Sequence, residues 1–169
     1  MQNRRSVIGL VGVVLLAGCV PAAAPSPAVI SSAAPPWPAP RDGVSYIDAA
    51  GMPRLPYNDT DDPHTFTMTI TRNGQPVHVA AHIGMDRVRA WQAPVHTHDT
   101  SGVVWLEGNG NRDVTLAQFF EVWGVRFTSS CLGDVCGTLT VTADGQPVAD
   151  PGSFVLRNVR RELAVAVTG

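Results

Sequence analysis

The sequence predicts an α+β domain in which one short helix covers a small mixed sheet with the strand order of a ubiquitin-like β-grasp. Three observations predict this class. Threonines alternate with apolar residues before an Asn73-Gly74 turn, a pattern typical of a β-hairpin. Residues 115–124 carry the signals of both helix ends. The chain then returns to strand patterns at residues 139–143 and 163–167. A small β-sandwich is the alternative fold.

The first hairpin is predicted from its turn outwards. A two-residue turn at Asn73-Gly74 pairs Ile70 with Val77. The same register, carried further, pairs Phe66 with Ala81. All the apolar residues of both strands then lie on one face, and threonines occupy the other.

A second strand and the helix follow. In Val103–Glu107, Val104 and Leu106 are predicted to face the core, with Trp105 and Glu107 on the opposite face. Thr115 is the predicted N-cap and Gln118 completes a capping box, while Gly124 ends the helix. The apolar stripe of this helix consists of Leu116, Phe119, Phe120 and Trp123.

The last strands complete the predicted sheet. Residues 140–148, TVTADGQPV, match residues 69–77, TITRNGQPV, at six of nine positions, which predicts a second hairpin. The final strand alternates Leu163, Val165 and Val167 with alanines, as expected for a central, covered strand. Residues 103–169 therefore run strand, helix, strand with tight turn, irregular stretch, terminal strand, which is the β-grasp order. Residues 41–63 and 84–102 show no period and are predicted to be irregular.

The N-terminus predicts export and anchoring. Residues 1–18 resemble a lipoprotein signal peptide, because Arg4 and Arg5 precede a short apolar run and Leu16-Ala17-Gly18-Cys19 matches the lipobox. An ordinary secretory peptide is the alternative. Cys19 is the predicted lipidation site, and residues 19–43 form a Pro/Ala-rich tether before a single domain at residues 44–169. We therefore expect a protein anchored by its lipid at the outer face of the cell membrane, in the cell envelope. Trp37 is expected to be a stray apolar residue of the tether, with docking on the domain as the alternative.

Composition excludes two classes of protein. The chain of 169 residues is 44% hydrophobic and only 15% charged, which excludes a highly charged disordered chain. The net charge is −2 and all twelve cationic residues are arginines. Without the signal peptide, ten arginines face fourteen acidic residues, a net charge of −4. No basic patch stands out, so nucleic acid is not an expected partner. The membrane is the expected partner through the lipid on Cys19, and an unknown protein partner is a further one.

Cys131 and Cys136 remain once Cys19 is lipidated. In an oxidising compartment a disulfide between them is expected. The alternative is a pair of thiolate metal ligands, although the spacing differs from the Cys-x-x-Cys of common zinc sites.

His96 and His98 are the main candidates for chemistry. In extended chain, side chains two positions apart point the same way, so both imidazoles could hold one transition-metal ion, such as copper or zinc. Asp99, Glu107 or His64 could add a ligand. The alternative is that both rings only brace their loop through internal hydrogen bonds. His78 and His82 lie about 13 Å apart along a strand, too far to share a metal, and are expected to face solvent.

Common catalytic motifs are missing from the sequence. It has no Gly-x-Ser-x-Gly, phosphate loop or dinucleotide fingerprint, and Thr100 and Ser101 stand where a metallo-β-lactamase pattern needs Asp and His. The first hypothesis is therefore a non-enzymatic, membrane-anchored protein whose domain binds a ligand, such as a copper ion. A structural or protein-partner-binding module without metal is the second.

Two segments carry a resemblance. HTHDTSGVVWLEG at residues 96–108 and TLAQFFEVWGV at residues 115–125 are similar to an uncharacterised extracytoplasmic family of bacteria and archaea. Its members carry His-Thr-His-Asp-x-x-Gly, an aliphatic-His-aliphatic-Glu strand, and Thr-Leu-Gly-Gln-Phe-Phe-x-x-Trp-Gly. The resemblance covers residues 64–169 and implies a single domain with no established activity. Trp105 departs from it, because the family has histidine there, which puts one potential ligand in doubt.

Overall fold

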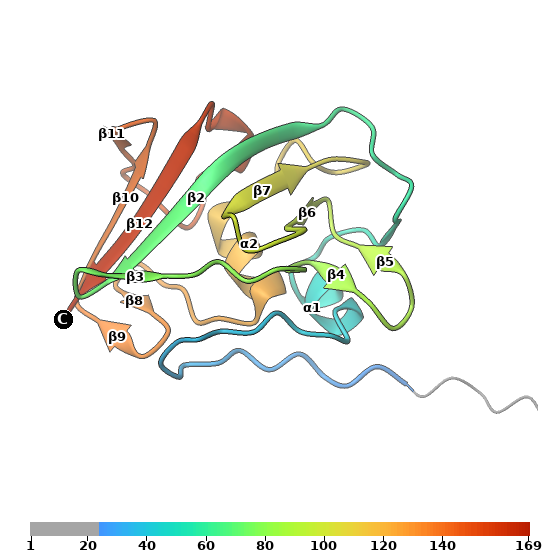
Figure 1. Cartoon of the computed structure of the whole chain (residues 1–169), viewed down its shortest axis with the longest axis horizontal. Helices are drawn as coiled ribbons and strands as arrows, with labels where there is room; N and C mark the ends of the chain where they lie inside the picture. Colours follow the sequence, from blue (N-terminus) through green and yellow to red (C-terminus); the bar gives the residue numbers. More distant parts are fainter. Residues whose placement is uncertain (1–23) are drawn as a thin grey trace, which may run out of the picture.

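The structure, a computed structural model, describes residues 24–169 and is built on a seven-stranded mixed sheet (Figure 1). Its strands are β2 (His64–Arg72), β3 (Gln75–Val77), β6 (Val95–His96), β7 (Val103–Leu106), β10 (Thr138–Ala143), β11 (Gln146–Pro147) and β12 (Glu162–Thr168). They lie in the order β11-β10-β12-β2-β7-β6, with β3 also paired to β2. β12 runs parallel to β2 and the other neighbours are antiparallel. The predicted α+β class with a mixed sheet is confirmed.

The strand order contains the predicted β-grasp arrangement. The hairpin β2–β3 lies next to the terminal strand β12, which in turn pairs with β10. The first strand of this arrangement is β2, however, and not β7 as the order of residues 103–169 suggested. β7 instead pairs with the beginning of β2, while β3 pairs with its end.

Both predicted hairpin turns are present. Asn73 and Gly74 have φ values of 49° and 75°, and Asp144 and Gly145 have φ values of 50° and 79°. Positive φ at both central residues is the geometry that suits a two-residue hairpin turn. The predicted pairing of Ile70 with Val77 is confirmed.

The predicted extension of the first hairpin is wrong. β3 ends at Val77, and Phe66 pairs with Val104 of β7 instead of Ala81. The amide of Met68 donates to the carbonyl of Gly102, 2.8 Å away. This edge of β2 is therefore shared between two partners that are distant in sequence, which no local pattern reveals. His78 is exposed as expected, whereas His82 is half-buried in a turn at a φ of 64°.

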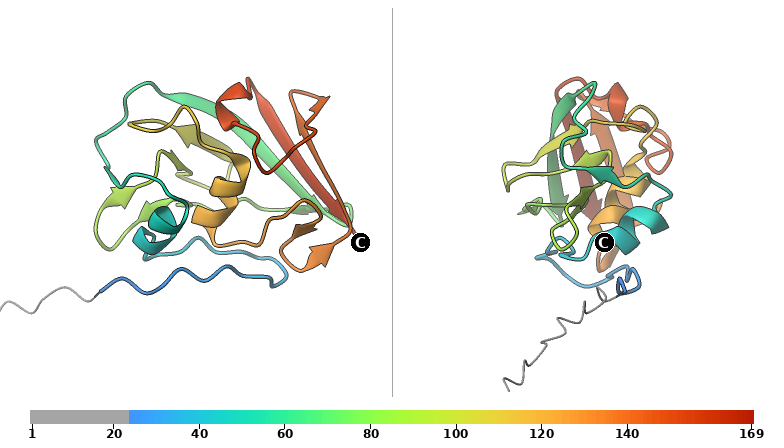
Figure 2. Two further views of the ribbon diagram at one scale, coloured as in Figure 1. Left: turned by 180° about the vertical axis from the view of Figure 1, so that it is seen from behind. Right: turned by 90° about the vertical axis from the view of Figure 1, so that its right-hand side faces the viewer.

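Helix α2 (Leu116–Trp123) packs on one face of the sheet (Figure 2). The Thr115–Gln118 capping box is formed in both directions, and Gly124 ends the helix at a φ of 74°. The predicted stripe is buried: Leu116, Phe119 and Phe120 are inaccessible to solvent and Trp123 is 1% exposed. The core therefore lies between α2 and the inward residues of β2, β7 and β12.

Several short elements surround this core and were not predicted. Helix α1 (Val44–Ala49) contacts α2 and lies in the stretch expected to be irregular. The predicted connection of residues 84–102 contains β4 (Met85–Asp86) and β5 (Trp91–Gln92), which form a three-stranded sheet with β1 (Leu55–Pro56). A second small sheet pairs β8 (Cys131–Leu132) with β9 (Val135–Cys136), and η1 (Leu156–Asn158) is a 3₁₀ turn.

The end of the predicted tether packs on the domain. Trp37 is 4% exposed and meets Trp123 edge to face, with 5.7 Å between ring centroids. Ser31 exchanges backbone hydrogen bonds with Gly124 and Arg126, each 2.8 Å long. Trp37 is therefore a docking point, and the expectation of a stray residue is wrong because a large apolar ring gains more by burial than by exposure.

The predicted signal peptide and lipidation site, residues 1–18 and Cys19, lie outside the described residues. Within residues 24–169, none of the helices has both the length and the apolar character needed to cross a bilayer.

Candidate metal centre

The candidate site is built on two neighbouring strands, β6 and β7. His96 pairs directly with Trp105, and Val95 with Leu106. Because neighbouring residues of a strand point to opposite faces, Val95 and Leu106 face the core while His96 and Trp105 share the other face. Glu107, two residues after Trp105, belongs to this same face.

His96 is completely buried, and one of its ring nitrogens has no hydrogen-bond partner within residues 24–169. Its Nδ1 lies 3.2 Å from the carbonyl oxygen of Ala93. A carbonyl only accepts hydrogen bonds, so Nδ1 carries the proton and Nε2 presents a lone pair. Burial lowers the pKa of His96 to about 4, against the smaller opposing effect of the Ala93 carbonyl, so the ring is neutral near pH 7.

The free nitrogen of His96 faces the carboxylate of Glu107. Nε2 and Oε1 are 3.2 Å apart, yet they are not aligned as a hydrogen bond and Nε2 has no partner among the described residues. Glu107 is 5% exposed, and burial is the main effect that raises its pKa. Two electron-rich atoms thus meet in a buried space where a cation, either a proton or a metal ion, would stabilise both.

His98 lies at the solvent side of the group. Its side chain is exposed, and its ring packs edge to face on those of His96 and Trp105, with centroid distances of 4.9 and 5.3 Å. One ligand atom from each of His96, His98 and Glu107 lies within 4.8 Å of the other two. In a tetrahedral zinc site, ligand atoms about 2.1 Å from the ion lie about 3.4 Å from one another. An inward movement of the exposed His98 ring would therefore bring the three ligand atoms toward the spacing that one ion needs.

Residues around the site hold its backbone in place. Thr97, between the two histidines, is fully buried, and its hydroxyl donates to the Ala80 carbonyl at 2.7 Å and accepts from the Ile83 amide at 3.0 Å. Gly84 has a φ of 70°, and a Cβ there would lie 2.2 Å from the Val95 carbonyl oxygen. Only glycine allows the chain to pass so close to the strand that carries His96.

Two other predicted ligands lie elsewhere. His64 pairs with Leu106, so it shares the face of β7 opposite to Glu107, and its Nε2 lies 2.7 Å from the Val159 carbonyl. The Asp99 carboxylate accepts hydrogen bonds from the amide and hydroxyl of Ser101. The structure therefore groups His96, His98 and Glu107, and neither His64 nor Asp99 belongs to the metal-ligand group found among the described residues.

Sequence reasoning missed the groups that fix the buried ring. The Ala93 carbonyl selects the tautomer of His96, and the buried Gln92 side chain lowers the pKa of Glu107 against the larger effect of burial. Gln92 and Ala93 both lie in the stretch expected to be irregular, where no periodic pattern signals which residues turn inward.

The predicted disulfide is present. Cys131 and Cys136 are bonded across the β8–β9 hairpin, where they are direct partners in the register. Their sulfurs are therefore not free to ligate a metal.

No family model, no curated protein and no solved structure matches the chain. The resemblance of residues 64–169 to an extracytoplasmic family stays a prediction.

Proposed function

We propose that the chain is a lipid-anchored, extracytoplasmic protein whose domain binds one transition-metal ion without catalysing a reaction. The ion, copper(II) or zinc(II), is held by Nε2 of His96, a ring nitrogen of His98 and the carboxylate of Glu107. Imidazole and carboxylate ligands suit both metals. The lipid on Cys19 and the location at the outer membrane face are parts of the proposal that depend on the sequence alone.

The observation that carries the proposal is the lone pair on His96 Nε2. The alternative role, in which His96 only braces its loop, explains the hydrogen bond from Nδ1 to the Ala93 carbonyl. Bracing leaves Nε2 buried, 3.2 Å from a carboxylate oxygen and without a hydrogen-bond partner in the described part of the chain. Buried polar atoms in native proteins are normally satisfied, and an unsatisfied one costs about 1–3 kcal/mol. A bound metal ion would remove this cost and neutralise the carboxylate at the same time.

The exposure of His98 supports an exchangeable site. Two ligands are buried and fixed, whereas the third stands at the surface beside Trp105. A metal ion would enter by way of His98 and keep at least one position for water or another ligand, since four-coordination needs one more donor than the protein supplies.

Calorimetric titration of the purified protein with Cu(II), Zn(II) and Cu(I) tests the proposal. We expect one site with submicromolar affinity for a divalent ion, which His98→Ala weakens at least tenfold. His98 is exposed, so this substitution leaves the fold intact. His78→Ala, which removes another exposed histidine that is not part of the His96, His98 and Glu107 group, is the matched control and should bind normally. Absence of binding by the unaltered protein would refute the metal site and leave a structural or partner-binding module.

A further inference from the structure

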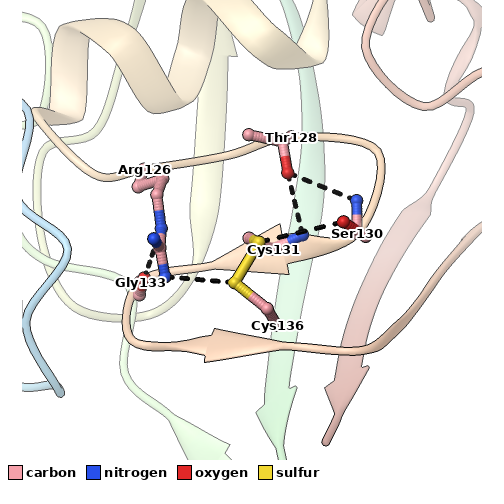
Figure 3. The surroundings of a disulfide bond; sticks show 6 residues. All are labelled: Arg126, Thr128, Ser130, Cys131, Gly133 and Cys136. Carbon is pink, nitrogen blue, oxygen red and sulfur yellow. Dashed lines mark hydrogen bonds between the residues drawn. A yellow bond between two sulfur atoms is a disulfide. The ribbon is translucent and has the colours of Figure 1, made fainter.

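The disulfide lies at the surface beside a fixed arginine. Cys136 is exposed and Cys131 is half-buried. The Arg126 guanidinium places Nη2 3.3 Å from Cys136 Sγ, while its Nε donates to the Gly133 carbonyl at 2.8 Å (Figure 3). The arginine is thus held by the hairpin backbone with its positive charge against one of the two sulfurs.

The two sulfurs have different surroundings. Cys131 Sγ has the neutral Ser130 hydroxyl 3.8 Å away, toward the opposite end of β8 from the arginine (Figure 3). A cation beside a cysteine stabilises its thiolate and lowers the pKa of the thiol. In thiol–disulfide exchange, the sulfur with the lower thiol pKa leaves faster. Attack on Cys131 with departure of Cys136 is therefore the favoured direction.

We propose that Cys131–Cys136 is a redox-active disulfide that accepts two electrons from a dithiol. One thiolate of the donor attacks Cys131 Sγ and forms a mixed disulfide, and Cys136 leaves as a thiolate next to Arg126. The second donor thiolate then attacks the donor sulfur of the mixed disulfide, which closes the donor disulfide and releases Cys131 as a thiolate. The two protons of the donor dithiol balance the two thiols that form on this chain.

The hairpin is held in place without the disulfide. Leu132 is fully buried and Val135 is 7% exposed, both in the central core. Asp134 at the tip forms an ion pair with Arg72 of β2, and the Gly137 amide donates to the Ser130 carbonyl at 2.8 Å. Reduction therefore breaks one bond in a hairpin that stays anchored, and exchange is reversible without unfolding.

Equilibration of the purified full chain in glutathione redox buffers tests the proposal. Two glutathione molecules supply the two electrons, and mass spectrometry after thiol alkylation reads Cys131 and Cys136 separately from Cys19. We expect partial reduction at intermediate glutathione ratios. Arg126→Gln should lower the equilibrium constant for reduction roughly three- to tenfold, because the Cys136 thiolate loses its cation. Arg72→Gln removes an ion pair of the same hairpin but no sulfur contact, and should leave that constant unchanged.

A single-thiol variant gives a second readout. Cys131→Ser leaves Cys136 free, and the pH dependence of its alkylation reports its pKa, which should fall below the usual value of about 8.5. Adding Arg126→Gln should return the pKa of Cys136 to that value. A disulfide that stays oxidised in reduced glutathione, or an Arg126→Gln substitution that changes neither the equilibrium constant for reduction nor the pKa of Cys136, would show that the bond is purely structural.

Discussion

Substitution of Asp86 in β4 tests how much its buried hydrogen bonds contribute to the stability of the fold around the candidate site. Its side chain is fully buried and accepts four hydrogen bonds. Oδ1 accepts from the amides of Val88 and Arg89, at 2.9 and 2.7 Å. Oδ2 accepts from the amide of Val44, at 3.0 Å, and from Arg89 Nη1, at 3.2 Å. Helix α1 has no side-chain cap of its own at Gly43, so Asp86 satisfies its first amide from a distant strand.

The Asp86→Asn substitution keeps the shape of the side chain and removes one acceptor. An amide nitrogen in place of Oδ2 leaves the buried Val44 amide facing another donor, which costs about 1–3 kcal/mol. The Arg89 guanidinium loses one charged partner but keeps Asp42, 2.5 Å away. We therefore expect the free energy of unfolding to fall by about 2–4 kcal/mol at pH 7.

The contribution of the Asp86 carboxylate to the free energy of unfolding depends on pH in a direction that its pKa determines. Burial alone would raise the pKa of Asp86, but the hydrogen bonds from Arg89, Val44 and Val88 outweigh it and the pKa is lowered. A carboxylate with a lowered folded pKa stabilises the fold above its unfolded pKa, about 3.9, and loses this contribution as the pH falls through the folded value. The difference in stability between the unaltered protein and the Asp86→Asn variant should therefore be complete at pH 7 and shrink below about pH 4.

Urea denaturation followed by tryptophan fluorescence at pH 7 and pH 3 measures both effects. Asp48→Asn is the control, because Asp48 pairs with Arg54 at the surface with both side chains 46% exposed. It should change stability by less than about 1 kcal/mol. An Asp86→Asn variant as stable as this control at pH 7, or one that loses the same free energy of unfolding at pH 7 and pH 3, would contradict these expectations.

Three further predictions concern the docked segment and the site. Trp37→Ala should lower the free energy of unfolding by about 3–5 kcal/mol, because the ring is 4% exposed and packs on Trp123; a loss below about 1 kcal/mol in urea denaturation would contradict docking. Gly84→Ala should weaken zinc binding in calorimetry as well as stability, because its Cβ would lie 2.2 Å from the Val95 oxygen beside His96; unchanged affinity would show that this close approach does not position the ring. Zinc(II) at about 100 times its dissociation constant should stabilise the protein by about 2.7 kcal/mol, and a tenfold or greater loss of affinity in His98→Ala should reduce this gain to about 1.4 kcal/mol or less at the same zinc concentration in thermal unfolding; equal gains in both proteins would place the ion elsewhere.

Local sequence patterns correctly predicted the structural elements that depend on interactions between residues close in sequence. The turn at Asn73-Gly74 and the capping box of Thr115 and Gln118 depend on a few adjacent residues, and both are confirmed. Helix α1 lacked any such signal. Its first amide is satisfied by Asp86, 42 residues away in the sequence, so nothing near residue 44 marks its beginning.

The candidate site was predictable to the extent that it depends on the two-residue repeat of a strand. His96 and His98 were expected to point the same way, and Glu107 was placed on the outer face of its strand together with Trp105. The pairing of His96 with Trp105 brings the two histidines and Glu107 together in one group. Strand pairing also explains why His64, a predicted ligand, does not belong to this group. Its pairing with Leu106 sets it on the core face, and this register between β2 and β7 has no signature in either strand alone.

The register of β6 on β7 connects the site to the core. A slip of one residue reverses the face to which every side chain of a strand points. Such a slip in β6 would turn Val95 out of the core and His96 away from Glu107 at once. Val95 and Leu106 are direct partners and both are completely buried, so the same apolar contact that stabilises the sheet keeps the imidazole and the carboxylate together. Hydrophobic packing on the opposite face therefore enforces the placement of the His96 imidazole next to the Glu107 carboxylate in the proposed metal centre.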